Sequence, residues 1–165
     1  MSTELYDLTV PVFTRGLKNL SALLDKAVAH AGEGAEGLLQ NRLIGDMHPL
    51  VKQVQIATDS PKLCIARLSG VEAPVMEDTE TTIPELKSRI QATIGYLASV
   101  PREAIDGQED KEIVLKFPGG EWPFKGLAYV IGFAMPNFYF HLTTAYGLLR
   151  QAGVPLGKRD FMGAG

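Results

Sequence analysis

The sequence has few of the residue types that carry chemistry. Its 165 residues include one cysteine, one tryptophan and three histidines. A single cysteine excludes an internal disulfide framework and is typical of a reducing compartment, so we expect a cytoplasmic protein. So few histidines and cysteines make a complete set of metal ligands within one chain difficult to assemble. The formal charge is −3 and no run of lysine or arginine forms a basic stripe, so we expect no nucleic-acid partner.

Common sequence motifs are missing as well. The chain contains no serine elbow, Walker loop, Rossmann glycine pattern or paired-cysteine spacing. The segment Met1–Asp7 has two acids and no basic residue, which argues against a signal peptide. Residues 127–149 lack any charged side chain, a run about as long as a transmembrane helix. Because Asn137 and His141 lie near its middle, we expect a helix buried in protein and no membrane contact.

What remains is the composition of a globular protein. Hydrophobic residues make up 45% and charged residues 21% of a chain of one-domain length, so we assign residues 1–165 to one domain. Apolar residues at three- and four-residue steps predict four helices, over about residues 5–30, 46–70, 82–101 and 126–151. Alternating apolar residues around a Pro-Gly-Gly turn predict a hairpin at 106–125, and residues 156–165 form a tail. The sequence therefore predicts an all-α four-helix bundle with a small β-hairpin insertion between helices 3 and 4.

Local signals mark the starts of two of these helices. Asp46 is a candidate N-cap for the second helix, with Pro49 near its first turn. Thr82 and Glu85 have the spacing of a capping box at the start of the third helix. The acidic residues between positions 72 and 80 precede it, and we expect them to form a solvated loop.

Aromatic residues on the fourth helix outnumber those that one core stripe can bury. They predict either a surface between subunits, where tyrosine and phenylalanine are enriched, or packing against the hairpin. Because a lone hairpin is marginal in water, Trp122 and Phe124 are expected to cap one end of the bundle. The surplus aromatic residues are Tyr129, Phe133, Tyr139, Phe140 and Tyr146.

Two polar residues lie on the apolar face of the fourth helix. At about 100° per residue, Asn137 and His141 point the same way, one turn apart. An unpaired buried polar group costs about 1–3 kcal/mol, so both need partners. They indicate either a pocket that binds a metal or substrate inside the bundle, or a structural pair bonded to neighbours or to water.

The other candidate residues carry weaker signals. His48 lies off the apolar stripe of the second helix, so its spacing predicts a border or exposed position. His30 closes the first helix, where a cation suits the helix dipole. Cys64 falls on an apolar stripe, which favours a small buried side chain over a nucleophile.

Six segments carry a likeness to a known family: residues 46–50, 53–55, 66–70, 136–141, 143–146 and 153–158. They resemble an uncharacterised bacterial and fungal family, known as a domain of unknown function, of the DinB/YfiT-like superfamily. The likeness covers nearly the whole chain and includes a specific Pro-Asn-Phe-Tyr-Phe-His block. It implies a DinB-like four-helix bundle, commonly a homodimer.

The resemblance also implies a metal site. In the superfamily three histidines hold a divalent metal, often nickel or zinc, one on the second helix and two on the fourth. By position these correspond to His48, Asn137 and His141, so Asn137 replaces a histidine and the site is degenerate. The resemblance thus implies a metal-dependent enzyme with a weakened site. The alternative is a non-catalytic dimeric bundle that binds a small-molecule ligand or acts as an interaction module.

Overall fold

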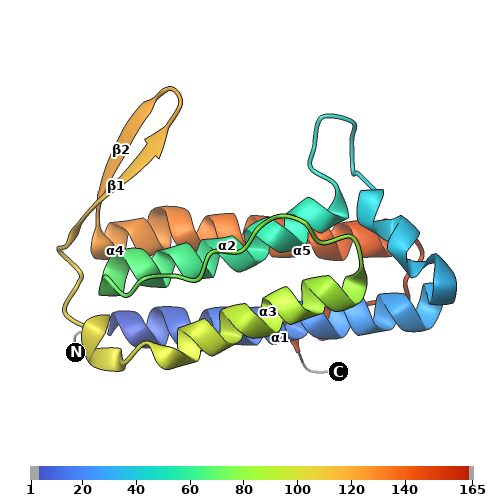
Figure 1. Ribbon diagram of the computed structural model, residues 1–165, viewed down its shortest axis with the longest axis horizontal. Coiled ribbons are helices and arrows are strands. Elements are labelled where there is room, and N and C mark those ends of the chain that lie inside the picture. Colours follow the sequence, from blue (N-terminus) through green and yellow to red (C-terminus); the bar gives the residue numbers. More distant parts are fainter. Residues whose placement is uncertain (1–3, 164–165) are drawn as a thin grey trace.

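A computed structural model describes residues 4–163 of the chain (Figure 1). The described part leaves out Met1–Thr3, the first residues of the segment considered above as a signal peptide. It also leaves out the last two residues of the tail. Among the helices of residues 4–163, none is both long and apolar enough to cross a membrane.

Four long helical segments form the bundle. The first three are α1 (Leu5–Ala31), α2 (Leu50–Ser69) and α3 (Ile83–Ser99). The fourth is built from α4 (Gly126–Tyr129), a π-helical turn η3 (Val130–Ala134) and α5 (Met135–Gln151). All run along the long axis in Figure 1, and α2 packs against α1, α3 and α5. This arrangement confirms the predicted four-helix bundle with a hairpin insertion.

Shorter elements connect and follow the long helices. The 3-10 helices are η1 (Gly32–Gln40) and η2 (Arg102–Ala104), and the expected C-terminal tail contains a short helix α6 (Lys158–Met162). The Asp160 carboxylate caps α6 by accepting a hydrogen bond from the Gly157 backbone N–H at 2.7 Å. The same carboxylate pairs with Lys26 of α1, which ties the tail to the bundle.

The predicted apolar stripe of α1 forms part of the core. Phe13, Leu17, Leu20 and Leu24 are all fully buried, and their three- and four-residue steps place them on one face of the helix. At Gly16, on the same helix, an added Cβ would lie 2.7 Å from the Phe138 ring. The absence of a side chain there lets α1 and α5 approach closely.

The two predicted helix starts have different outcomes. The capping box is confirmed: Thr82 Oγ1 accepts from the Glu85 N–H at 3.3 Å, and the Glu85 carboxylate accepts from the Thr82 N–H at 3.0 Å. The prediction of Asp46 as N-cap is wrong, because α2 begins at Leu50 with Pro49 as its N-cap residue. A residue before proline is disfavoured in the α conformation, so the helix does not extend back through His48. His48 instead lies in the loop of residues 41–49, which projects from the bundle (Figure 1).

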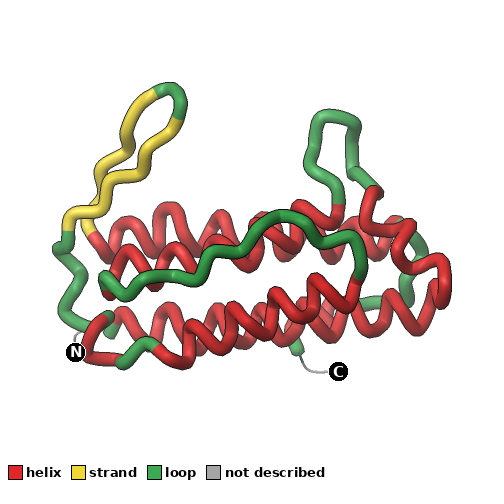
Figure 2. Tube along the Cα trace, in the orientation of Figure 1, coloured by secondary structure: helices red, strands yellow, loops and turns green. Residues whose placement is uncertain are grey.

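The hairpin also differs from expectation in its position. Strands β1 (Glu112–Phe117) and β2 (Gly120–Lys125) pair antiparallel, and Figure 2 shows them projecting away from the helices. Trp122 is 58% exposed and does not cap the bundle end. Its ring packs against Phe117, the last residue of β1, at 5.6 Å between centroids and against Phe133 at 6.4 Å, so these aromatic contacts hold the turn half of the hairpin against the fourth helix instead.

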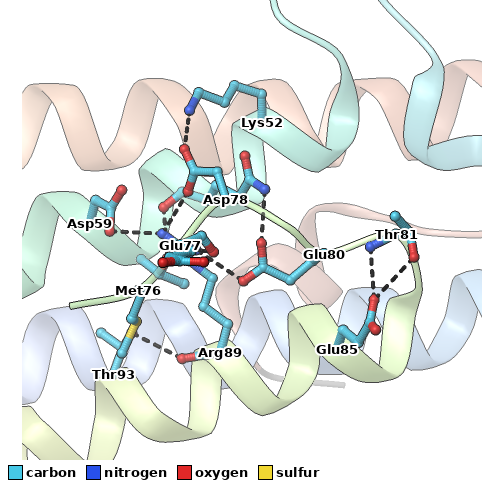
Figure 3. A network of polar contacts seen from close by, with 12 residues as sticks. Lys52, Asp59, Met76, Glu77, Asp78, Glu80, Thr81, Glu85, Arg89 and Thr93 are labelled. Atoms are coloured by element: carbon cyan, nitrogen blue, oxygen red, sulfur yellow. Dashed lines mark hydrogen bonds and ion pairs between the residues drawn. The ribbon is translucent and has the colours of Figure 1, made fainter. Parts of the chain in front are cut away.

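The acidic loop is held by a buried arginine. Residues 70–82 run lengthwise along the helices (Figure 2), and Arg89 of α3, with a side chain only 2% exposed, pairs with Asp78 and Glu80 of that loop and with Asp59 of α2 (Figure 3). Burial acts to raise the pKa of Glu80, but hydrogen bonds from Arg89 and Gln55 outweigh it and lower that pKa. The expectation of a merely solvated loop is therefore wrong for these two acids.

Candidate functional site

The centre of the candidate site is a hydrogen bond between α5 and α2. His141 is buried, and its Nδ1 lies 2.7 Å from Oε1 of Gln53. Nε2 of Gln53 donates to the backbone carbonyl of His48 at 3.1 Å, which identifies the other amide atom as the oxygen facing His141. An amide oxygen can only accept a hydrogen bond, so His141 carries its proton on Nδ1. The lone pair of the ring is then on Nε2.

His141 is uncharged at neutral pH. Burial, and then the charge of the nearby His48, lowers its pKa to about 4. Among residues 4–163 every fully buried side-chain nitrogen or oxygen has a hydrogen-bond partner. Nε2 of His141 makes no such bond within the described structure, so this atom must keep some contact with solvent. A neutral imidazole with a free, accessible Nε2 can bind a metal ion or accept a proton.

His48 reaches the site from the loop before α2. Its side chain is exposed, as its spacing indicated, although it is not on a helix. Gln53 links it to His141, because the same amide bonds the His48 carbonyl and the His141 ring. The structure thus brings His48 and His141 into one neighbourhood.

Asn137 is held by a different partner. Its Nδ2 donates to Oγ of Ser60 on α2 at 2.6 Å, and its side chain is partly buried. Both Asn137 and His141 therefore have protein partners, which matches the interpretation of a structural polar pair.

Cys64 is fully buried, and burial raises the pKa of its thiol to about 12, which confirms a structural role over a nucleophile.

The donor set does not reproduce a three-histidine metal site. No group of three or more histidine, cysteine, aspartate or glutamate side chains in residues 4–163 could hold a metal ion. An amide oxygen is a poor ligand for zinc or nickel, and the Asn137 amide is bonded to Ser60. Through Gln53 the structure places the His48 loop beside the His141 ring, and Asn137 stands at the position where the resemblance implies a third histidine.

Three residues of α2 that contact the fourth helix were missed by sequence reasoning. Gln53 meets His141, Ser60 meets Asn137, and Arg67 meets Tyr129, whose hydroxyl accepts from Arg67 Nη1 at 2.8 Å. The three α2 residues are seven positions apart, which places them on one face two turns from each other. This regular polar spacing along the α2 sequence is the signal that could have found them.

The π-helical turn explains why Tyr129 takes part. Uniform α-helical spacing places Tyr129 about 120° around the helix from His141. The π turn adds about one residue between them, which reduces this angle to about 20°. Tyr129 accordingly faces α2 and is 1% exposed. It also packs on Phe124 and Phe133, so the hairpin explanation holds for these fourth-helix aromatics.

The bundle and its hairpin define a class of protein. A solved structure described as a DinB family member protein from Shewanella denitrificans is similar to this chain, with 42% identity and a TM-score of 0.87 over 98% of this chain and 93% of that one. The protein is therefore a DinB-like helical bundle. The model of a family described as a domain of unknown function, DUF1993, matches residues 5–162, and the chain belongs to this family. No curated protein matches it.

Proposed function

We propose that the protein binds a divalent transition-metal ion reversibly through Nε2 of His141 and the imidazole of His48. The hydrogen bond from His141 Nδ1 to Gln53 carries this proposal. A metal-binding histidine commonly donates its second ring N–H to such a partner, which fixes the tautomer and the ring orientation. Burial of His141 supports the proposal further, because it keeps the ring neutral and able to coordinate.

Asn137 makes the proposed site a weak one. In the superfamily the corresponding position supplies a histidine, and the amide that replaces it is a poorer donor to nickel or zinc. We therefore expect an exchangeable ion. When bound, that ion would act as a Lewis acid toward a substrate group, as metals do in metal-dependent enzymes. The residues of the chain would hold and orient it, with Gln53 fixing His141.

Metal titration of protein purified without an affinity tag tests the proposal. Zinc and nickel binding, measured by calorimetry after chelator treatment, should weaken at least about tenfold in His141→Gln and His48→Gln. Glutamine at position 141 can still donate to Gln53, so the fold is preserved. His30→Gln is the matched control, because His30 is exposed at the end of α1, and its affinity should be unchanged. Uptake below about a tenth of an equivalent, or equal affinity in His141→Gln, would overturn the proposal.

The second candidate is a non-catalytic homodimeric bundle that binds a small ligand. Tyr139 and Phe140 of α5 favour it, because their side chains are 39% and 55% exposed. A second copy of the chain would cover these rings, since aromatic residues are enriched at interfaces.

Light scattering during size exclusion tests the dimer. Phe140→Asp should shift the mass from dimer to monomer, because a buried charge would oppose the interface. Val75→Asp is the control, since Val75 is also an exposed hydrophobic residue, 90% exposed and on the loop before α3. A monomeric wild type, or a dimer that tolerates Phe140→Asp, would contradict this assignment.

A further inference from the structure

A cleft lies between α2 and the fourth helix, on the side of Asn137 away from the loop of His48. Its volume is about 180 Å³, and neither His48 nor His141 lines it. The π-helical turn η3 contributes Phe133 and Ala134 to one wall, and Leu63 of α2 adds an apolar side chain. Regions of π-helix occur frequently at functional sites. The cleft is therefore a second place, separate from the two histidines, where the fold could hold a ligand.

The polar residues of the cleft are rich in hydrogen-bond donors. Arg67 carries five N–H groups, of which one is used on the Tyr129 hydroxyl oxygen at 2.8 Å. Because Tyr129 and Ser60 accept from Arg67 and Asn137, their own hydroxyl protons are free to be donated elsewhere. All four side chains line the cleft, so a group with several acceptor atoms would find matching donors there.

The charge of the cleft is positive at Arg67. Within residues 4–163 Arg67 forms no ion pair, and its guanidinium lies 5.7 Å from the Tyr129 ring centroid. Asp59, the carboxylate that lines the cleft, is already paired with Arg89 and Lys62, each at 2.9 Å. Burial raises the pKa of Tyr129 to about 12, so its hydroxyl stays protonated and able to donate.

We propose that this cleft binds a small apolar carboxylate. Arg67 and the Tyr129 hydroxyl hold the carboxylate oxygens, since an arginine fork matches a carboxylate in geometry as well as charge. Phe133, Ala134 and Leu63 contact the hydrocarbon part. The volume, about that of six water molecules, is below the roughly 300 Å³ of pockets for drug-sized ligands. The ligand is therefore a short-chain or single-ring acid.

This proposal is independent of the metal site, and its test is run in excess EDTA to keep the two apart. Calorimetry compares sodium benzoate and sodium butyrate with benzamide and butyramide, which have nearly the same shape and no charge. At least one of the two acids should bind saturably, and its amide at least about tenfold more weakly, because only the acid can pair with the guanidinium.

Variants locate the binding in the cleft. Arg67→Gln should weaken binding of the acid at least about tenfold, whereas Arg159→Gln, at an exposed position of α6, should leave it unchanged. Tyr129→Phe keeps the buried ring and removes the hydroxyl, so it should also weaken binding even if Arg67→Gln fails to fold. No saturable binding of either acid up to about 10 mM, equal binding of acid and amide, or unchanged affinity in a folded Arg67→Gln would overturn the proposal.

Discussion

Replacing His141 with glutamine will change how the stability of the protein depends on pH. The ring titrates near 6.5 in an unfolded chain, whereas burial, followed by the charge of His48, lowers its pKa to about 4 in the folded protein. Between these two values the unfolded state binds more protons than the folded state. The free energy of unfolding therefore falls as the pH is lowered from 6.5 toward 4. Above pH 6.5 the contribution of the neutral ring is fully present.

The size of the effect follows from the difference in pKa. Each pKa unit corresponds to about 1.4 kcal/mol, so the shift sets an upper limit of about 3 kcal/mol. Nε2 of His141 keeps contact with solvent, and water screens part of the cost of charging the ring. We therefore expect the wild type to lose about 1–2 kcal/mol more than His141→Gln over this pH range.

Urea unfolding at about pH 4.5 and about pH 7, with EDTA present, measures this difference. The carboxylates titrate in both proteins, so subtracting one stability change from the other isolates His141. His30→Gln, at the exposed end of α1, is the control and should follow the wild type. An NMR titration of the His141 ring gives a second measurement, with an expected midpoint near 4 and the proton on Nδ1.

Two outcomes would refute the reasoning. One is a stability difference between wild type and His141→Gln that is the same at both pH values. The other is a ring titration with its midpoint near the ordinary histidine value of about 6.5, since a ring held neutral by burial and by His48 cannot titrate there.

Three further substitutions, one of them a control, test the packing of the fold by urea unfolding. Gly126→Ala should destabilise the protein by about 1–3 kcal/mol, because the added Cβ would lie 2.0 Å from the backbone oxygen of Gln108. Gly95→Ala, where the Cβ meets nothing within 4 Å, should be neutral or stabilise α3 by up to about 1 kcal/mol, and a similar loss in both would contradict the steric argument. Arg89→Met should cost about 3–5 kcal/mol, because three carboxylates lose the buried partner they share; a loss below about 1 kcal/mol would mean that the loop before α3 does not depend on this network.

Much of the fold could be predicted because its signals are local. The stripe of Phe13, Leu17 and Leu24 and the capping box at Thr82 each depend on residues within a few turns of one another. Where local signals competed, prediction was wrong. Asp46 is a good N-cap residue, but Pro49 prevents the helix from reaching it, and α2 begins at Leu50.

The candidate site could be predicted only in part. Spacing on the fourth helix placed Asn137 and His141 on one face, and both do contact α2. His48 was joined to them by family resemblance, because nothing in the local pattern connects a loop residue to a helix 93 positions later. Gln53 was not identified, although it determines which nitrogen of His141 is free.

The sequence by itself determined the number of long helices, their apolar faces and the hairpin between the last two. Periodicity, capping and turn residues act over a few positions and can be read without knowing the neighbours. Only the tertiary structure decided which polar residues meet. The pairs Gln53–His141, Ser60–Asn137 and Arg67–Tyr129 are 88, 77 and 62 residues apart. Their contacts depend on how α2 and α5 align and on the π turn that rotates Tyr129 toward α2, and both are set by packing between helices.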